Sequence, residues 1–230
     1  MRLLLFDIDG TLVNTLGAGK AARETAMRSV YGETGPIDSF DFHGRTDPAI
    51  VRGLLRAVGW PDAEIEAGFE ATWETYLGVL DRELVGRDGR VHAYPGVREL
   101  LEVIEGDRRF APGLVTGNME GGAWRKLKVC GLARRFVFGA YGSDSERRED
   151  LPPIARDRAQ REYERPFDLR TAVVVGDTPE DIRCARANGT RVLAVSTGRH
   201  TVEELRDHDP DAVFEDLSDT TRVMRVLADE

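Results

Sequence analysis

The sequence predicts an α/β fold, in which a doubly wound parallel sheet carries an inserted all-helical subdomain. Apolar runs at residues 2–8, 112–116 and 171–176 are continuous rather than alternating, which is typical of strands covered by helices on both faces. Helical patterns separate the later strands, as the crossovers of a parallel sheet require. A long helical interval follows the first strand, and this interval predicts the insertion.

The remaining elements of the sheet domain follow from the same patterns. Further strands are expected at residues 191–195 and 211–214, with a short candidate at 136–138. Apolar residues recur at helical spacing between the strands. They predict helices at residues 96–105, 121–129, 151–163 and 179–188, the last of which is followed by Gly189 as a stop signal.

The interval from about residue 16 to residue 92 breaks the alternation of strand and helix. A parallel crossover needs only a dozen or more residues, so this interval is too long to be one connection. Its helical stretches are expected at residues 17–31, 47–58 and 62–84. We therefore predict a core domain at residues 1–15 and 93–230 and a helical insert at 16–92, with Tyr94-Pro95-Gly96 as the return hinge.

The composition excludes several classes of protein. The 230 residues are 41% hydrophobic and 32% charged, which indicates a globular chain rather than a disordered one. The net charge of −9 argues against nucleic-acid binding, which needs a concentrated basic face. No segment suits a membrane span or a signal peptide, and the two cysteines show no CxxC spacing. We expect a cytoplasmic monomer or homodimer without nucleic-acid or membrane partners.

Two aspartates, Asp7 and Asp9, follow the first apolar strand, and Gly10 permits a tight turn after them. Ligands bind at the carboxyl ends of parallel strands, and alternation along the strand puts both side chains on one side. Two carboxylates about 4 Å apart repel each other by about 4 kcal/mol at an effective dielectric near 20. A proton, a cation or both must offset that repulsion. The alternative is that Asp9-Gly10 is a turn signal and Asp7 ends the strand.

A second acidic pair, Asp177 and Asp181, follows the strand at 171–176. If this strand lies beside the first, up to four carboxylates converge, and a set of oxygen ligands suits a hard cation such as Mg²⁺. Asp181 has a structural alternative. It stands three residues after Thr178, as in a capping box that is worth about 1 kcal/mol.

A third group, Thr116-Gly117-Asn118, ends the strand at 112–116. Its hydroxyl and backbone N–H groups would lie at the same edge of the sheet, where they can hold an anion. The same three residues also suit an ordinary turn.

These three strand ends together resemble the haloacid dehalogenase superfamily. Asp7-x-Asp9-Gly10-Thr11 matches its first motif, Thr116 its second, and Gly176-Asp177-x-x-x-Asp181 its fourth. The helical insert resembles the small C1 cap of that family, and residues 42–47 (FHGRTD) resemble the cap loop of its phosphoglycolate phosphatase-like branch. The resemblance spans essentially the whole chain and implies a Rossmann-like core.

The resemblance implies a Mg²⁺-dependent phosphatase that cleaves a small phosphorylated metabolite through an aspartyl phosphate. Asp7 is then the nucleophile and Asp9 the acid and base. The implied metal ligands are Asp7, the backbone carbonyl of Asp9, and Asp177, with Asp181 supporting them. Thr116 and an arginine would hold the phosphoryl oxygens, and Gly117 and Asn118 would extend that cradle.

The third family motif, normally a lysine, departs from the pattern in this sequence. The corresponding region reads RREDLPP, at residues 147–153, and contains no lysine. We expect Arg148 to substitute, in preference to Arg147, because of its distance from the proline pair. The alternative is that both arginines are solvated loop residues.

The cap loop is expected to determine which leaving group is accepted. Arg45, with His43 and Asp47, would face the leaving group, and Arg45 would suit a second anion such as a carboxylate. Thr46 or Asp47 before Pro48 also suits a helix start. Two other functions stay open: phosphoryl transfer within a sugar phosphate, as in β-phosphoglucomutases, and a non-catalytic phosphoacceptor domain. The insert argues against the second, because a phosphorylation switch needs no cover over its aspartate.

Overall fold

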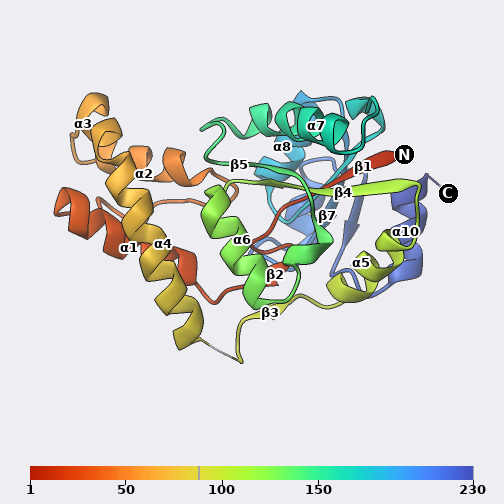
Figure 1. The fold of residues 1–230 in the computed structure, drawn as a ribbon, viewed down its shortest axis with the longest axis horizontal. Helices are drawn as coiled ribbons and strands as arrows, with labels where there is room; N and C mark the ends of the chain where they lie inside the picture. Colours follow the sequence, from red (N-terminus) through yellow and green to blue (C-terminus); the bar gives the residue numbers. More distant parts are fainter. Residues whose placement is uncertain (88, 230) are drawn as a thin grey trace.

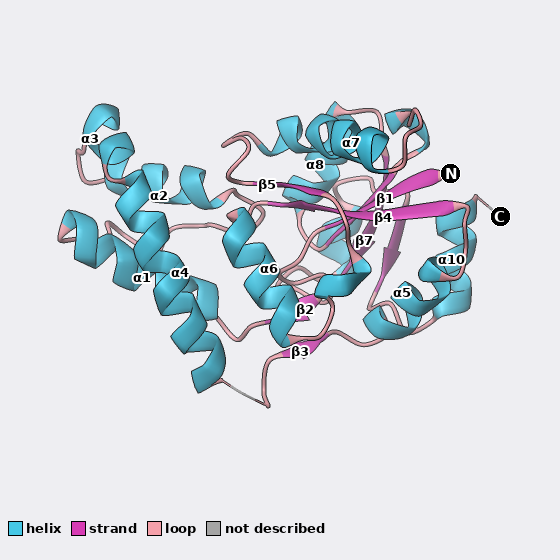
Figure 2. Ribbon diagram, viewed as in Figure 1, coloured by secondary structure: helices cyan, strands magenta, loops and turns pink. Residues whose placement is uncertain are grey.

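The computed structural model describes residues 1–87 and 89–229, and its centre is a six-stranded parallel sheet with helices on both faces (Figures 1 and 2). The strand order is β5-β4-β1-β6-β7-β8, and every neighbouring pair is parallel. The strands are β1 (Arg2–Phe6), β4 (Phe110–Thr116), β5 (Gly139–Tyr141), β6 (Val173–Gly176), β7 (Arg191–Val195) and β8 (Ala212–Phe214). The predicted α/β class is confirmed.

The helices of the sheet domain divide between two apolar layers. They are α5 (Val97–Glu105), α6 (Glu120–Val129), α7 (Leu151–Glu162), α8 (Pro179–Ala187), α9 (Val202–Arg206) and α10 (Thr220–Ala228). Alternate residues of β1 serve both layers, as a strand period of two requires. Leu4 and Phe6 pack in the layer that contains α5, α6 and α10, whereas Leu3 and Leu5 pack in the layer with α7, α8 and α9.

The short strand expected at 136–138 lies three residues later, as β5. Phe136 and Phe138 are buried on opposite faces of the sheet instead, and Val137 between them is 57% exposed. The ladder with β4 begins where Gly139 comes alongside Leu114, and a Cβ on that glycine would lie 2.7 Å from the Leu114 Cβ. Gly139 therefore leaves room for the Leu114 side chain where the ladder begins.

The inserted segment folds as four helices that lie to one side of the sheet (Figure 1). They are α1 (Ala18–Tyr31), α2 (Asp47–Arg56), α3 (Asp62–Ala67) and α4 (Phe69–Gly86), and they bury two apolar clusters of their own. The single helix expected at 62–84 is two helices separated by Gly68. The Tyr31 ring fills the space beside Gly68, and the Tyr31 hydroxyl donates to the Ile65 carbonyl at 2.6 Å.

Two short strands that the sequence analysis did not predict lie at the ends of the insert. The two-residue strands β2 (Val13–Asn14) and β3 (His92–Ala93) pair antiparallel at its base. Strands this short carry no readable periodicity, so pattern analysis misses them. None of the helices in residues 1–87 and 89–229 has the length and apolar character of a membrane span.

Candidate active site

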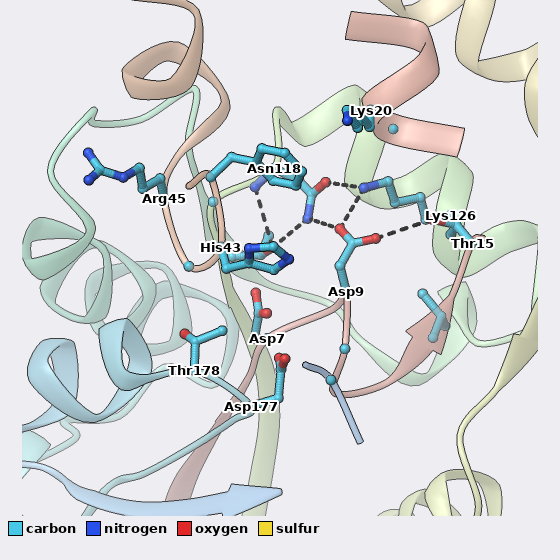
Figure 3. A pocket seen from close by; sticks show the side chains of 18 of the residues that line it. Asp7, Asp9, Thr15, Lys20, His43, Arg45, Asn118, Lys126, Asp177 and Thr178 are labelled. Carbon is cyan, nitrogen blue, oxygen red and sulfur yellow. Dashed lines mark hydrogen bonds and ion pairs between the residues drawn. The ribbon is translucent and has the colours of Figure 1, made fainter. Parts of the chain in front are cut away.

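Three aspartates meet at the carboxyl ends of β1 and β6. The two strands pair in parallel with Phe6 opposite Val175, so the residues that follow them, Asp7 and Asp177, face each other (Figure 3). Asp181 joins them from the first turn of α8, and one carboxylate oxygen of each aspartate lies within 4.8 Å of the others. All three are at most 6% exposed. The predicted meeting of the first and late strand ends is therefore observed.

The three buried carboxylates carry more negative charge than the nearby basic side chains of the described residues balance. Burial raises the pKa of Asp7 to about 6, with Asp181 and Asp9 adding to the shift and Arg148 opposing it. Burial, followed by repulsion from Asp181 and Asp7, raises the pKa of Asp177 well above its ordinary value. Such a set favours a bound cation or a proton. Because every donor is a carboxylate oxygen, the set fits a hard divalent cation.

Glycines let the backbone approach Asp177 closely. Gly10 has φ +84°, which favours glycine, and a Cβ on it would lie 2.2 Å from Asp177 Oδ2. A Cβ on Gly198 would lie 1.8 Å from the same oxygen. The Thr11 hydroxyl donates to the other oxygen of Asp177 at 2.9 Å. The sequence DIDGT therefore supplies Asp7, and its Gly10 leaves the space that the Asp177 carboxylate occupies.

Arg148 lies beside Asp7, where the sequence predicts an arginine in place of the lysine of the third family motif. Its Nη2 lies 3.0 Å from Asp7 Oδ1 and also donates to Asp181. Its Nη1 donates to the Gly44 carbonyl at 3.0 Å, so it links the sheet domain to the inserted segment. Arg148 is 7% exposed, whereas the side chain of Arg147 is 76% exposed.

Asp181 has both of the roles that the sequence allowed. The predicted capping box is confirmed, because Asp181 Oδ2 accepts from the Thr178 backbone N–H at 3.0 Å and the Asp181 N–H donates to the Thr178 hydroxyl at 3.3 Å. Its other oxygen holds Arg148. The helix cap therefore also orients the arginine beside Asp7.

The carboxylate of Asp9 does not join the other three, which corrects the expectation of four converging side chains. It accepts from Lys126 Nζ at 2.5 Å and from Asn118 Nδ2 at 2.9 Å (Figure 3). β1 ends at Phe6, so strand alternation does not extend as far as Asp9. Burial would raise the pKa of Asp9, but Lys126 and the Asn118 hydrogen bond outweigh it and lower the pKa.

The third predicted group connects to this network. Thr116 is fully buried at the end of β4, and its hydroxyl accepts from Asn118 Nδ2 at 2.7 Å. Asn118 Oδ1 accepts from Lys126 Nζ at 2.5 Å. Gly117 lies directly under the inserted segment, because a Cβ there would be 2.2 Å from the Arg45 carbonyl oxygen.

Lys126 is the site residue that sequence reasoning missed. It lies on α6 and is 3% exposed, with its ammonium between Asp9 and Asn118. Burial would lower its pKa, but Asp9 and other nearby groups raise it. A signal was available, because Lys126 falls at helical spacing from Ala123, beside Leu127, on the apolar face of the helix. A lysine on such a face requires a buried partner.

The loop at residues 42–47 lies over the site. His43 lines the cavity and lies 2.9 Å from Asp41. Arg45 is exposed at the rim, where its guanidinium lies 5.4 Å from the Phe40 ring centroid and points away from Asp7 (Figure 3). Arg45 is among the residues that line the cavity, but its side chain packs on Phe40, and its role toward the leaving group stays a prediction.

Asp47 is not the cap of α2, since Thr46 fills that place and accepts from the Ala49 N–H at 3.3 Å. Asp47 is buried instead, with Arg23 Nη2 at 2.5 Å from its Oδ1. Its Oδ2 accepts from the Met119 backbone N–H at 2.9 Å. Arg23 and Asp47 thus form a buried ion pair between α1 and the start of α2, and Asp47 ties that pair to the loop after β4.

These groups line one cavity of about 280 Å³ between the strand ends and the inserted helices. Contacts beside it join the inserted segment to the sheet domain. The Thr46 hydroxyl donates to the Glu146 carbonyl at 2.8 Å, and Arg52 lies 2.7 Å from the Glu146 carboxylate. Arg199, after β7, lies 3.2 Å from Asp41.

Comparisons with known proteins agree with this architecture. A family model described as haloacid dehalogenase-like hydrolase matches residues 4–195. The phosphoglycolate phosphatase of Pseudomonas fluorescens is 25% identical over 221 residues, which cover 94% of this chain and 77% of the relative. A protein of Dickeya dadantii named probable phosphatase IndB is also 25% identical, over 98% of this chain and 94% of its own length.

Solved structures show the same fold. A hydrolase from Pseudomonas syringae superposes with a TM-score of 0.71 at 19% identity, over 97% of this chain and 98% of that one. A putative beta-phosphoglucomutase from Thermotoga maritima superposes with a TM-score of 0.61 at 18% identity, over 98% and 99% of the two chains. At these identities the likeness concerns the fold, and the strand ends carry the chemistry.

Proposed function

The chain belongs to the haloacid dehalogenase-like hydrolases, and from that membership we propose that it is a Mg²⁺-dependent phosphatase of small phosphorylated metabolites. The observation that carries the proposal is the meeting of Asp7 with Asp177 and Asp181 beside Arg148. Phosphoglycolate is the first substrate to test, because several relatives are named phosphoglycolate phosphatases.

Asp7 acts as the nucleophile in this proposal. Its carboxylate attacks the phosphorus, the bond from phosphorus to the leaving oxygen breaks, and an aspartyl phosphate forms. Water then attacks the same phosphorus, which releases orthophosphate and restores Asp7. Arg148, within 3.0 Å of Asp7, orients the nucleophile and holds a phosphoryl oxygen. Asp7, the Asp9 carbonyl and Asp177 would hold Mg²⁺, with Asp181 supporting them; the ion offsets their repulsion and that of the phosphoryl dianion.

Asp9 moves the protons. It donates one to the leaving oxygen in the first step and removes one from water in the second. Lys126 and Asn118 fix its carboxylate, and the lowered pKa of Asp9 keeps it ionised, as the base of the second step must be. A phosphoryl dianion beside Asp9 disfavours its charged form, which suits the acid of the first step.

Thr116, with backbone N–H groups of Gly117 and Asn118, completes the phosphoryl cradle in this proposal. Residues 16–92 then act as a cap that excludes bulk water, and the core comprises residues 1–15 and 93–230. The contacts of Gly44 with Arg148 and of Arg45 with Gly117 support this role, because they bring the loop of the insert directly over the strand ends.

Orthophosphate release from a panel of phosphorylated metabolites tests the proposal. We expect turnover with Mg²⁺, none after chelation, and none in the Asp7→Asn variant. The panel includes a sugar monophosphate with a trace of its bisphosphate, and we expect free phosphate from it rather than isomerised sugar. Turnover that persists in Asp7→Asn would overturn the assignment of the nucleophile, as would labelling of the protein without release of phosphate.

A further inference from the structure

Arg23 on α1 is a buried arginine that the proposed chemistry does not use. It lines the cavity and is 6% exposed. Its Nη2 donates to Asp47 at 2.5 Å, but its Nε is buried without a hydrogen-bond partner in residues 1–87 and 89–229. A buried donor left unpaired is unfavourable, so a group that supplies an acceptor there gains affinity.

The position of Arg23 is fixed from the core side. Asp47, which holds it, accepts from the Met119 N–H at 2.9 Å and donates its own N–H to the Gly117 carbonyl at 2.7 Å. Gly117 and Met119 flank Asn118 in the loop after β4. The guanidinium is therefore tied to the same loop that would cradle the phosphoryl group.

Lys20 and Phe42 complete one wall of the cavity with Arg23. Lys20 lies three residues before Arg23 on α1, so the two share a face of the helix. Lys20 Nζ and Arg23 Cζ lie 5.8 and 6.0 Å from the centroid of the Phe42 ring. Lys20 pairs with Asp38, whose carboxylate is 94% exposed and is screened by water.

We propose that Arg23 is a specificity-determining residue, and that its free Nε–H, supported by Lys20, binds a carboxylate on the leaving-group side of the substrate. This inference rests on the proposed phosphatase function and names the substrate class. In this proposal Arg23, rather than Arg45, contacts the leaving group, because Arg45 lies at the rim and packs on Phe40.

The charge of the cavity favours an anion over a neutral hydroxyl. Five basic side chains line it, with Arg45 at the rim, against four aspartates, although the whole chain carries a net charge of −9. Arginine forms its strongest hydrogen bonds with carboxylates, and a hydroxyl would satisfy the Nε donor without balancing the charge of this wall.

A matched pair of substrates tests the proposal. Phosphoglycolate and 2-hydroxyethyl phosphate share the same phosphoester and differ only in a carboxylate against a hydroxymethyl group. We expect the wild-type protein to prefer phosphoglycolate, and Arg23→Gln to lower that preference, as a ratio of kcat/KM values, by about 10- to 100-fold. Arg28→Gln, an exposed arginine of the same helix paired with Glu24, is the control and should leave both rates unchanged.

A double variant and a binding measurement complete the test. Arg23→Gln leaves Asp47 buried without its cation, so the double variant Arg23→Gln/Asp47→Asn removes both charges and should lose the same preference. Calorimetry with the inactive Asp7→Asn protein measures binding of the two esters without turnover, and the ratio of dissociation constants should fall when Arg23→Gln is added.

The outcomes separate the two proposals. Asp7-dependent turnover with equal losses on both esters would overturn the role of Arg23 and leave the phosphatase function standing. Preference for an ethanediol bisphosphate over phosphoglycolate would overturn the carboxylate. Absence of turnover on any ester would contradict the phosphatase function, and the binding ratio would then still support or refute Arg23.

Discussion

Replacing Asp7 with asparagine is expected to stabilise the metal-free protein while it abolishes turnover. Burial and neighbouring carboxylates raise the pKa of Asp7 from 3.8 to about 6. A shift of about two units corresponds to about 3 kcal/mol of unfavourable free energy for the ionised form at neutral pH. Asparagine keeps the shape of the side chain and removes that charge. Its weaker hydrogen bond with Arg148 offsets part of the gain, which leaves about 2 kcal/mol.

The sign of this effect fixes its pH dependence. A group whose pKa is raised in the folded state favours folding at low pH and loses that contribution as pH rises through the folded pKa. Metal-free wild-type protein should therefore lose stability between about pH 4 and 6, whereas Asp7→Asn lacks this loss. The stability difference between the two proteins should grow across that window and stay constant above about pH 7.

Urea unfolding in a chelator at pH 7.5 and at pH 4.5 measures this difference. For a chain of this size, about 2 kcal/mol raises Tm by about 4–8 °C. Asp181→Asn is the control, because it weakens a helix cap and the bond to Arg148 and should destabilise the protein. Mg²⁺ should reverse the order by stabilising wild type more. Asp7→Asn that is less stable than wild type in chelator at pH 7.5 would refute the reasoning.

Three further changes have defined outcomes. Lys126→Met removes the cation that lowers the pKa of Asp9, so the basic limb of the kcat/KM profile, which reports Asp9 as the acid of the first step, should move to higher pH; an unmoved limb contradicts that link. Gly117→Ala places a Cβ 2.2 Å from the Arg45 carbonyl, so kinetics should show kcat/KM reduced at least about tenfold; unchanged kinetics would mean that this contact is absent during turnover. Thr178→Val removes the capping box and should cost about 1 kcal/mol in urea unfolding, while Thr178→Ser keeps it; equal losses contradict the capping account.

The parts that sequence predicts best are those set by periodicity and by strand ends. Strands buried on both faces carry continuous apolar runs, so β1, β6 and β7 are readable without structure. The parallel order then brings the residues after β1 and β6 to one edge, which is why Asp7 and Asp177 could be paired across 170 residues of sequence. Arg148 could be preferred over Arg147 because only its spacing from the prolines resembled the family motif.

The parts that sequence does not predict depend on where chains cross in space. The Asp9 carboxylate turns toward Lys126 because β1 ends at Phe6, and no local pattern shows that end. The Arg23–Asp47 pair joins two segments of the insert. The Nε of Arg23 lacks a hydrogen-bond partner among the described residues, and this is apparent only from the packed structure. Pairs of this kind are set by tertiary contacts rather than by composition or spacing.

Chemical trapping of the intermediate tests the central claim most directly. Borohydride reduces an acyl phosphate to an alcohol, so an aspartyl phosphate becomes homoserine at its own position. We predict that protein quenched during turnover with Mg²⁺ and then reduced contains homoserine at position 7, found by mass spectrometry, and that chelated protein contains none. Homoserine at another aspartate, or none at position 7 while phosphate is being released, would contradict the account.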